Sequence, residues 1–387
     1  MSSSRRRFLA AGLALPAAAS ATRSEEQTQT QPPSRKLGTP AFQYKVLGKT
    51  GLKVTKLGFG CMVTSDGSVV ERAADLGITY FDTARGYMNG NNERMVGAAL
   101  KRKRNDITLS TKTHAATKEE ALRDLDTSLK ELGTDHVEIW YLHAKTRPEE
   151  VTDDLIEAQQ IAKKAGKIRF AGVSSHSGQK ELLPWLAKNP HIDVVLTGYN
   201  FTQEAFMNEV IAEVEKAGKG VVAMKVMAGG IRRMRPGDPN LDRLKRDGAL
   251  PAALQWVLQN PHIHTAIPSM TDMDQLEENL KAMAQPFGEP QKKLLAMHLR
   301  DISPLYCRMC GACDGQCRKG LPVADVLRFL TYAEGYGQFG LARERYQELD
   351  PAHASAKCAD CPGCTVQCPH GVKVASRLMR AQELFAC

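Results

Sequence analysis

Residues 107–142 read ITLSTKTHAATKEEALRDLDTSLKELGTDHVEIWYL and predict a strand, a helix and a second strand in succession. Ile107–Thr111 and Val137–Leu142 are short runs of β-branched and apolar residues, a pattern that favours strands. Between them, Thr117 and Glu120 have the spacing of a helix capping box. The predicted helix has one apolar face, formed by Leu122, Leu125, Leu129 and Leu132.

The same alternation of short strands and amphipathic segments extends in both directions from this stretch, over residues 42–288. Further strands are predicted at Val54–Phe59, Ile78–Phe81, Ile168–Val173, Val194–Leu196, Val221–Met224 and His264–Ile267. Eight strands, each followed by a helix, favour the α/β class and a (β/α)8 TIM barrel. An open dinucleotide-binding sheet is disfavoured, because no G-x-G-x-x-G follows the first strand.

Polar side chains follow three of the predicted strands. Asp82 and Tyr87 follow the second strand, Lys112 ends the third and His143 ends the fourth. Because the carboxyl ends of barrel strands meet at one mouth, we expect these four side chains to converge there. A phenol of pKa about 10 becomes a usable proton donor or base when an ammonium stabilises its phenolate. Tyr87 is therefore the expected proton donor or acceptor and Lys112 its activator. Asp82 would keep Lys112 charged, and His143 would orient a carbonyl oxygen or share the proton.

These four residues, in this order and at these strand ends, resemble the catalytic tetrad of the aldo-keto reductase family, and the resemblance covers about residues 44–284. It implies an oxidoreductase that interconverts small carbonyl compounds and alcohols, with NAD(P) as its cofactor. It also implies five cofactor-binding residues, namely Ser174, Ser175, Ser269, Glu278 and Asn279.

The residues expected near the cofactor depart from the family pattern in places. Ser175 stands where the family usually has Asn, and Met224 or Lys225 stands where it has a stacking aromatic. Gln275 stands where NADP-using members often have Arg, so the choice between NAD, NADP and no nicotinamide cofactor stays open. The basic loop at residues 232–235 could reach over a pyrophosphate or be a solvated charged loop.

Eight cysteines near the C-terminus form two runs of C-x2-C-x2-C-x3-C spacing, namely Cys307, Cys310, Cys313 and Cys317, then Cys358, Cys361, Cys364 and Cys368. This is the ligand spacing of bacterial ferredoxins, in which the fourth cysteine of one run binds the other cluster. We therefore expect residues 289–387 to form a small ferredoxin-like domain of helices and loops with two 4Fe-4S clusters, between which Cys317 and Cys368 cross over. Four disulfides or zinc sites are the alternatives, although zinc sites typically use two cysteine pairs.

Residues 1–21 have the features of a twin-arginine export signal. Arg5, Arg6 and Arg7 precede an apolar run that ends in the A-x-A pattern of residues 19–21. The run is shorter than the roughly 20 residues that a membrane span needs, so we expect a periplasmic or exported protein with no stable membrane span. A frayed basic N-terminus on a cytoplasmic protein is the alternative. Residues 22–41, rich in Ser, Thr, Gln and Pro, predict a disordered spacer.

The formal net charge of +9 falls to +6 without residues 1–21, a mild excess that suits an acidic redox protein partner or an anionic cofactor. No basic patch with interleaved aromatic residues favours nucleic acid. Together, the features predict an exported iron-sulfur oxidoreductase of aldo-keto reductase type. The alternative is an electron-transfer or structural iron-sulfur protein with an inactive barrel. Hydride transfer moves two electrons together, clusters move one at a time, and no flavin motif bridges the two.

Overall fold

The structure, a computed structural model, describes residues 42–229 and 248–385. These residues lie within one compact unit, Thr39–Cys387. The predicted export signal at residues 1–21, the spacer at 22–41 and the basic loop at 232–235 lie outside the described residues.

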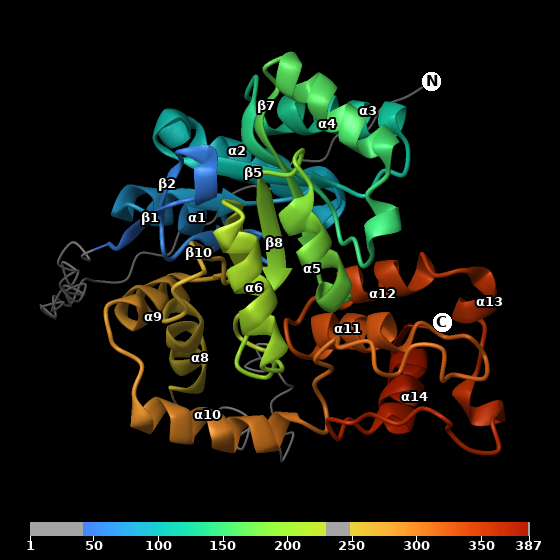
Figure 1. Cartoon of the computed structure of the whole chain (residues 1–387). Helices are drawn as coiled ribbons and strands as arrows, with labels where there is room; N and C mark the ends of the chain where they lie inside the picture. Colours follow the sequence, from blue (N-terminus) through green and yellow to red (C-terminus); the bar gives the residue numbers. More distant parts are fainter. Residues whose placement is uncertain (1–41, 230–247, 386–387) are drawn as a thin grey trace, which may run out of the picture. The chain divides into compact units, whose positions relative to one another are not determined.

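Eight parallel strands form a closed barrel in this unit (Figure 1). They pair in sequence order from β3 to β10, and the bridges Leu57–Ala266 and Gly60–Ser269 join the last strand region to the first. The strands are β3 (Phe59–Gly60), β4 (Tyr80–Asp82), β5 (Thr108–Thr113), β6 (Val137–Leu142), β7 (Ile168–Ser175), β8 (Val194–Gly198), β9 (Gly220–Met224) and β10 (Thr265–Ala266). The helices around them are α1 (Gly67–Leu76), α2 (Asn91–Leu100), α3 (Lys118–Leu132), α4 (Asp153–Lys164), α5 (Gln179–Lys188), α6 (Phe206–Lys216), α8 (Ala249–Leu258) and α9 (Met273–Met283). The predicted (β/α)8 barrel is confirmed.

The predicted first barrel strand, at residues 54–59, is wrong in its extent. Its first two residues belong to β2 (Lys53–Thr55), which pairs antiparallel with β1 (Tyr44–Val46) ahead of the barrel. The Thr55 hydroxyl donates to the Leu57 carbonyl (2.7 Å), and the chain bends before β3 begins. A run of β-branched and apolar residues does not reveal such a bend, because the bend leaves no periodic signal in the sequence.

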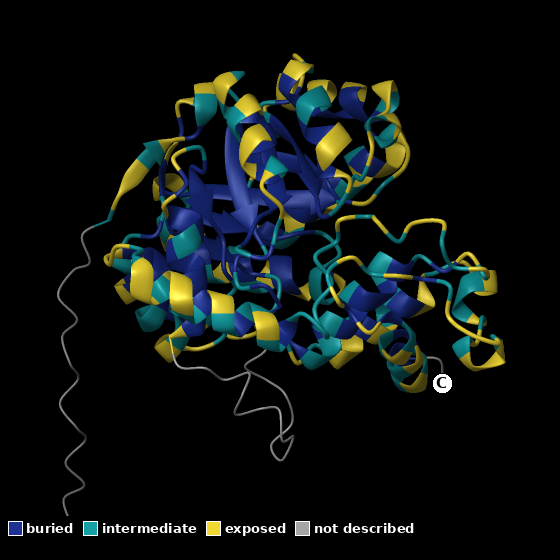
Figure 2. Ribbon diagram, turned by 60° about the horizontal axis from the view of Figure 1, so that its bottom comes forward, coloured by how far each residue is buried: buried dark blue, intermediate teal, exposed yellow. Residues whose placement is uncertain are grey.

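The helix predicted after Thr117 is α3. The Thr117 hydroxyl accepts a hydrogen bond from the Glu120 amide (3.3 Å), which satisfies one of the free N–H groups of the first turn. The predicted apolar face packs inward, with Leu125, Leu129 and Leu132 buried. Figure 2 shows the same pattern around the barrel, in which the strands are buried and the outer faces of the helices are exposed.

The C-terminal region adds five helices, α10 (Glu289–Ile302), α11 (Val323–Glu334), α12 (Phe339–Gln347), α13 (Pro351–Ala354) and α14 (Val374–Phe385). Leu295 of α10 packs against α8 of the barrel. Helices α11, α12 and α14 gather around a small core of their own that includes Leu330, Tyr346 and Phe385 (Figure 1).

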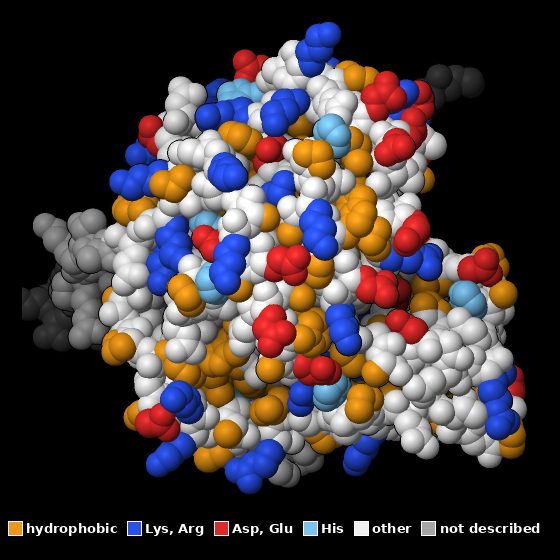
Figure 3. Space-filling model, viewed as in Figure 1, with side chains coloured by type: hydrophobic (Ala, Val, Ile, Leu, Met, Phe, Trp, Pro, Cys, Tyr) orange, Lys and Arg blue, Asp and Glu red, His pale blue; other side chains and the backbone are white. Residues whose placement is uncertain are grey.

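On the face shown in Figure 3, basic and acidic side chains are interspersed over the barrel helices and the C-terminal region. Within residues 42–229 and 248–385, no helix has both the length and the apolar character that crossing a membrane requires.

The packing of α2 on α3 makes a prediction about Gly97. A Cβ at Gly97 would lie 2.2 Å from the Leu132 carbonyl oxygen, a backbone atom that cannot move aside easily. Alanine is the better helix former by about 1 kcal/mol. We nevertheless expect Gly97→Ala to lower the free energy of unfolding by about 1–3 kcal/mol.

Gly340→Ala is the matched control. Gly340 lies in α12, and a methyl group added there would have no neighbouring atom within 4 Å, so the replacement should leave stability unchanged or raise it by up to about 1 kcal/mol. Chemical denaturation of both variants measures the difference. A Gly97→Ala variant as stable as Gly340→Ala would contradict the tight contact between α2 and α3.

Candidate active site

Asp82 and Lys112 form a buried ion pair at the carboxyl ends of β4 and β5. The register places Asp82 opposite Ser110, so Lys112, two residues further along β5, points to the same side of the sheet. Lys112 Nζ donates to Asp82 Oδ2 (2.5 Å) and to the Thr83 carbonyl (2.7 Å). Ser110 Oγ donates to the other carboxylate oxygen (2.7 Å). Burial raises the pKa of Asp82 and lowers that of Lys112, while the attraction between their charges opposes both shifts.

Tyr87 begins a short 3-10 helix, Tyr87–Gly90, beside this ion pair. Lys112 Nζ lies 3.3 Å from the phenolic oxygen of Tyr87 and 4.8 Å from the centre of its ring. Burial, followed by the negative charge of Asp82, raises the pKa of Tyr87 well above its ordinary value. Burial therefore outweighs the stabilisation of the phenolate by Lys112 that the sequence predicted. Tyr87 is a protonated phenol at neutral pH, the form that donates a proton.

His143 follows β6 at the same mouth and is 7% exposed. Its ring stacks on that of His114 with 3.9 Å between centres and meets the Tyr87 ring edge-on at 5.9 Å. Burial lowers the pKa of His143 well below its ordinary value, so the ring is neutral, and its Nδ1 has no hydrogen-bond partner among the described residues. The structure thus brings the four predicted residues of the tetrad together in one place.

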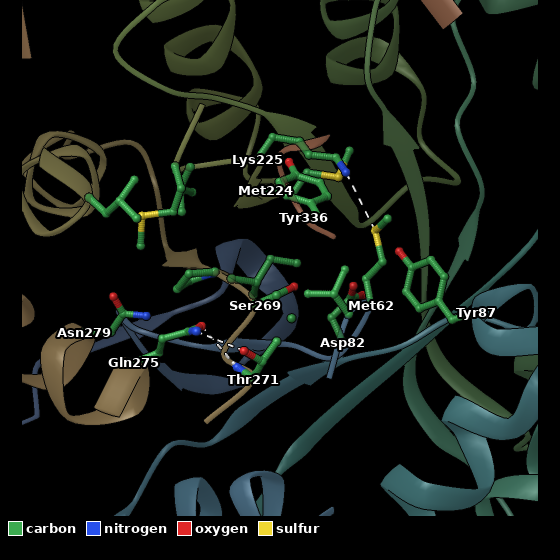
Figure 4. A pocket seen from close by; sticks show the side chains of 18 of the residues that line it. Met62, Asp82, Tyr87, Met224, Lys225, Ser269, Thr271, Gln275, Asn279 and Tyr336 are labelled. Atoms are coloured by element: carbon green, nitrogen blue, oxygen red, sulfur yellow. Dashed lines mark hydrogen bonds between the residues drawn. The ribbon is translucent and has the colours of Figure 1, made fainter. Parts of the chain in front are cut away.

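A long cavity runs from Asp82 and Tyr87 across the barrel mouth to α9 (Figure 4). Gln275 and Asn279 of α9 lie at its far end, and apolar residues form much of its wall between the two ends. Tyr336, from the segment after α11, also lines it. An apolar cleft with a few polar groups at defined places is the usual form of a small-molecule or cofactor site.

The structure divides the five predicted cofactor-binding residues into two groups. Ser269, Glu278 and Asn279 line the long cavity. Ser174 and Ser175 do not line it, because their hydroxyls bond to backbone groups of the neighbouring loops. Ser174 Oγ accepts from the Ala144 amide (2.9 Å), and Ser175 Oγ donates to the Ser177 carbonyl (2.7 Å). Their local role is to hold the loops that follow β6 and β7.

A second cavity, here called the mouth cavity, lies between the barrel and the C-terminal region. Tyr87 and His143 line it from the barrel, and Arg328, Tyr332 and Arg345 line it from α11 and α12. The sequence interpretation missed these last three residues, because their place depends on how α11 and α12 pack against the barrel. One signal was present, since residues four apart, as Arg328 and Tyr332 are, share a face of a helix.

The two cysteine runs lie close together in space. The thiols that interact electrostatically with Cys307 are those of Cys310, Cys313 and Cys368. Those that interact with Cys358 are the thiols of Cys317, Cys361 and Cys364. The second set of four lines a cavity of about 250 Å³. All nine cysteines in the described part of the chain are free thiols.

A family model described as the aldo/keto reductase family matches residues 64–299, more than half of the chain. The matched segment includes the ion pair, the phenol and the imidazole described above. The chain belongs to the aldo/keto reductase family. It is an oxidoreductase of that type, and the family implies NAD(P)H as cofactor and small carbonyl compounds as substrates. The match ends before α11, so both cysteine runs lie beyond it.

Similar proteins support this assignment over the same part of the chain. The uncharacterized oxidoreductase YqkF of Bacillus subtilis is 27% identical over 299 residues, which cover 66% of this chain and 95% of the relative. A probable voltage-gated potassium channel subunit beta of Arabidopsis thaliana is 26% identical, over 62% of this chain and 91% of the relative. The solved holo form of an aldo-keto reductase from Bacillus halodurans is 27% identical, with a TM-score of 0.57, over 66% of this chain and 96% of that one.

The buried ion pair predicts a large effect on stability. Asp82→Asn leaves the Lys112 ammonium buried without its counter-charge, and we expect the free energy of unfolding to fall by about 3–5 kcal/mol. Adding Lys112→Met removes the stranded charge and should recover most of the loss. Urea denaturation of the single and double variants measures both changes.

An exposed ion pair provides the control. Glu71→Gln breaks the contact of Glu71 with Arg102, whose side chains are 45% and 65% exposed, and should cost less than about 1 kcal/mol. Two results would contradict this prediction. Asp82→Asn could lower the free energy of unfolding no more than Glu71→Gln does, or the double variant could be no more stable than Asp82→Asn. Either result would mean that the buried Lys112 ammonium does not need the Asp82 carboxylate.

Proposed function

We propose that this protein reduces small carbonyl compounds, or oxidises the corresponding alcohols, at the mouth of the barrel. The observation that carries the proposal is that Tyr87, Lys112, Asp82 and His143 lie together, with Asp82 and Tyr87 at one end of the long cavity. A protonated phenol beside an ammonium is suited to proton transfer, and this phenol faces the adjoining cavity.

The proposed reaction uses each residue of the site for one task. NAD(P)H, when bound in the long cavity, would supply the hydride. Tyr87 donates its phenolic proton to the carbonyl oxygen. Lys112, 3.3 Å from the phenolic oxygen, stabilises the phenolate that remains, and Asp82 holds Lys112 in place. His143, whose Nδ1 finds no partner in residues 42–229 and 248–385, orients the carbonyl oxygen through a hydrogen bond. In the alcohol-oxidising direction, the same proton returns to Tyr87.

We assign the cofactor to the long cavity. Ser269, Glu278 and Asn279 line the part of the cavity away from Tyr87 and would hold NAD(P) there. Gln275, whose Nε2 donates to Thr271 Oγ1 (2.9 Å), offers no positive charge for a 2′-phosphate. We propose that Ser174 and Ser175 act indirectly, through the loops that their hydroxyls hold.

We also propose that the C-terminal region, residues 289–387, binds two 4Fe-4S clusters. Two observations support this. The cysteine spacing matches that of bacterial ferredoxins, and the structure gathers Cys307, Cys310, Cys313 and Cys368 into one set and Cys317, Cys358, Cys361 and Cys364 into the other. The clusters would exchange single electrons with a redox protein partner.

We further propose that the protein is exported to the periplasm by the twin-arginine route. The paired arginines and the A-x-A pattern within residues 1–21 support this proposal. That route carries folded proteins, so both NAD(P) and the clusters would be bound before export.

Tyr87→Phe tests the reductase proposal. The variant keeps the ring and loses the proton donor, so we expect kcat for NAD(P)H-dependent reduction of an aldehyde panel to fall by about 10²–10⁴-fold. Binding of NAD(P)H, measured by fluorescence titration, should persist. Tyr199→Phe removes a buried hydroxyl that bonds to Asn208 and lines neither the long cavity nor the mouth cavity, so its activity should stay near that of the wild type. Full cluster content without nicotinamide binding or turnover would instead favour the electron-transfer or structural alternative.

Metal analysis after anaerobic purification tests the clusters. We expect about eight irons and eight sulfides per chain from two 4Fe-4S centres. Cys307→Ala and Cys358→Ala should each halve the iron content, whereas Cys61→Ala, outside both runs, should retain it. Zinc in place of iron, with no broad visible absorption, would exclude the clusters.

Double variants test the crossed assignment. Because Cys317 is assigned to the same cluster as Cys358, replacing both with alanine should leave about four irons. Replacing Cys317 together with Cys307 should remove the iron of both clusters. If replacing Cys317 and Cys358 instead removed all the iron, and replacing Cys317 and Cys307 left about four irons, each cysteine run would bind a cluster of its own.

A further inference from the structure

The mouth cavity, of about 450 Å³, receives two guanidinium groups from the C-terminal region. Arg328 of α11 and Arg345 of α12 line it, opposite Tyr87 and His143 of the barrel. The two arginine side chains are only 16% and 20% exposed. Arg345 Nη2 also donates to the Gly86 carbonyl (3.2 Å), next to Tyr87, which ties α12 to the reaction centre.

The carboxylates that pair with these arginines lie closer to solvent than the arginines do. Asp325 Oδ1 is 2.6 Å from Arg328 Nη2, and Glu348 Oε2 is 2.7 Å from Arg345 Nη1. Their side chains are 48% and 51% exposed. Glu348 lines the cavity beside the two arginines and Asp325 does not, so the charged side chains in the cavity wall leave an excess of one positive charge.

Lys225, which lines the neighbouring long cavity, adds a third positive charge. Its ammonium lies 4.6 Å from the centre of the Tyr332 ring and 3.7 Å from Met62 Sδ, and both of those residues line the mouth cavity. Among the described residues, no carboxylate lies within ion-pair distance of Lys225. The backbone of Lys225 is left-handed, with φ of +58°, a strained conformation for a non-glycine residue that is typical of functional sites.

Two neutral imidazoles offer the cavity further hydrogen-bonding atoms. His143 and His176 line it and are 7% and 9% exposed, and within the described part of the chain each has an Nδ1 without a partner. Burial lowers the pKa of both rings well below the ordinary value, and nearby cations, Arg328 among them for His176, lower it further. Buried polar atoms without partners are costly, so the site is built to receive a polar ligand.

We infer that the substrate is a carbonyl compound with an anionic group, a carboxylate or a phosphate, which Arg328 binds while the carbonyl lies at Tyr87 and His143. The inference rests on the proposed reductase function and adds the substrate class to it. A guanidinium presents a planar fork of N–H donors that matches a carboxylate or phosphate, and its attraction is strong where water is largely excluded. Lys225 and Arg345 contribute charge at longer range.

Matched aldehydes test the inference on the full-length, anaerobically purified protein. The probes are 4-carboxybenzaldehyde, 4-formylphenyl phosphate and the neutral 4-methylbenzaldehyde. We expect the wild type to show a kcat/KM at least tenfold higher for one of the anions than for the neutral aldehyde. Arg328→Met should lower that ratio by about 10- to 100-fold, as expected for the loss of a charge-assisted hydrogen bond. Arg328→Lys should give an intermediate ratio.

Arg102→Met is the control, because it removes the same charge from an exposed arginine outside both cavities and should leave the ratio unchanged. Circular dichroism checks that each variant folds. If Arg328→Met does not fold, the same ratio of kcat/KM is measured for Lys225→Met. The inference is overturned if the wild-type ratio of kcat/KM between the anionic and neutral aldehydes is near one, or if these variants leave that ratio unchanged. In either case, turnover of the neutral aldehyde would still support the proposed reductase function.

If no aldehyde is reduced, the proposed function fails, and binding decides the inference separately. Calorimetric titration then compares 4-methylbenzoate with its uncharged analogue 4-methylbenzamide. Preferential binding of the carboxylate that weakens in Arg328→Met supports an anion site. Equal binding of the two probes, or binding of neither, overturns it.

Discussion

The ion pair between Asp82 and Lys112 is the interaction on which the rest of the site depends. Each charge alone would be costly to bury, and the pair is tolerated because Ser110 and the Thr83 carbonyl satisfy further hydrogen-bonding positions. The parallel pairing of β4 and β5 makes this contact possible, since it brings two strand ends to the same level. With Lys112 held there, Tyr87 has an ammonium beside its phenolic oxygen, and the chemistry of an oxidoreductase has a fixed centre.

The C-terminal region completes the site around that centre. Helix α12 reaches the barrel through Arg345 and the Gly86 carbonyl, and Tyr332 of α11 lies against Lys225 after β9. Both the long cavity and the mouth cavity have walls from this region. The cysteine segments pack on the same small core as α11, so binding of metal there would stabilise the helices that line the cavities. The C-terminal region is therefore part of the walls around the catalytic residues of the barrel.

Much of the fold could be predicted, because buried parallel strands and amphipathic helices leave clear local patterns. Val137–Leu142 and the α3 helix occur where the sequence placed them. One failure has an equally local cause. Residues 54–59 are two short strands with a bend between them, and the bend leaves no periodic signal in the sequence. Only the structure shows that the Ser174 hydroxyl accepts a hydrogen bond from the Ala144 amide.

The sequence by itself determined the barrel, the order of the four polar residues at its strand ends and the spacing of the two cysteine runs, since each of these is a local pattern along the chain. Only the tertiary structure decided that burial keeps Tyr87 protonated, and that Arg328, Tyr332 and Lys225 meet beside it. The physical reason is that desolvation and electrostatic potential depend on every atom packed around a group. Those atoms come from segments far apart in the sequence, and no periodicity records which of them will meet.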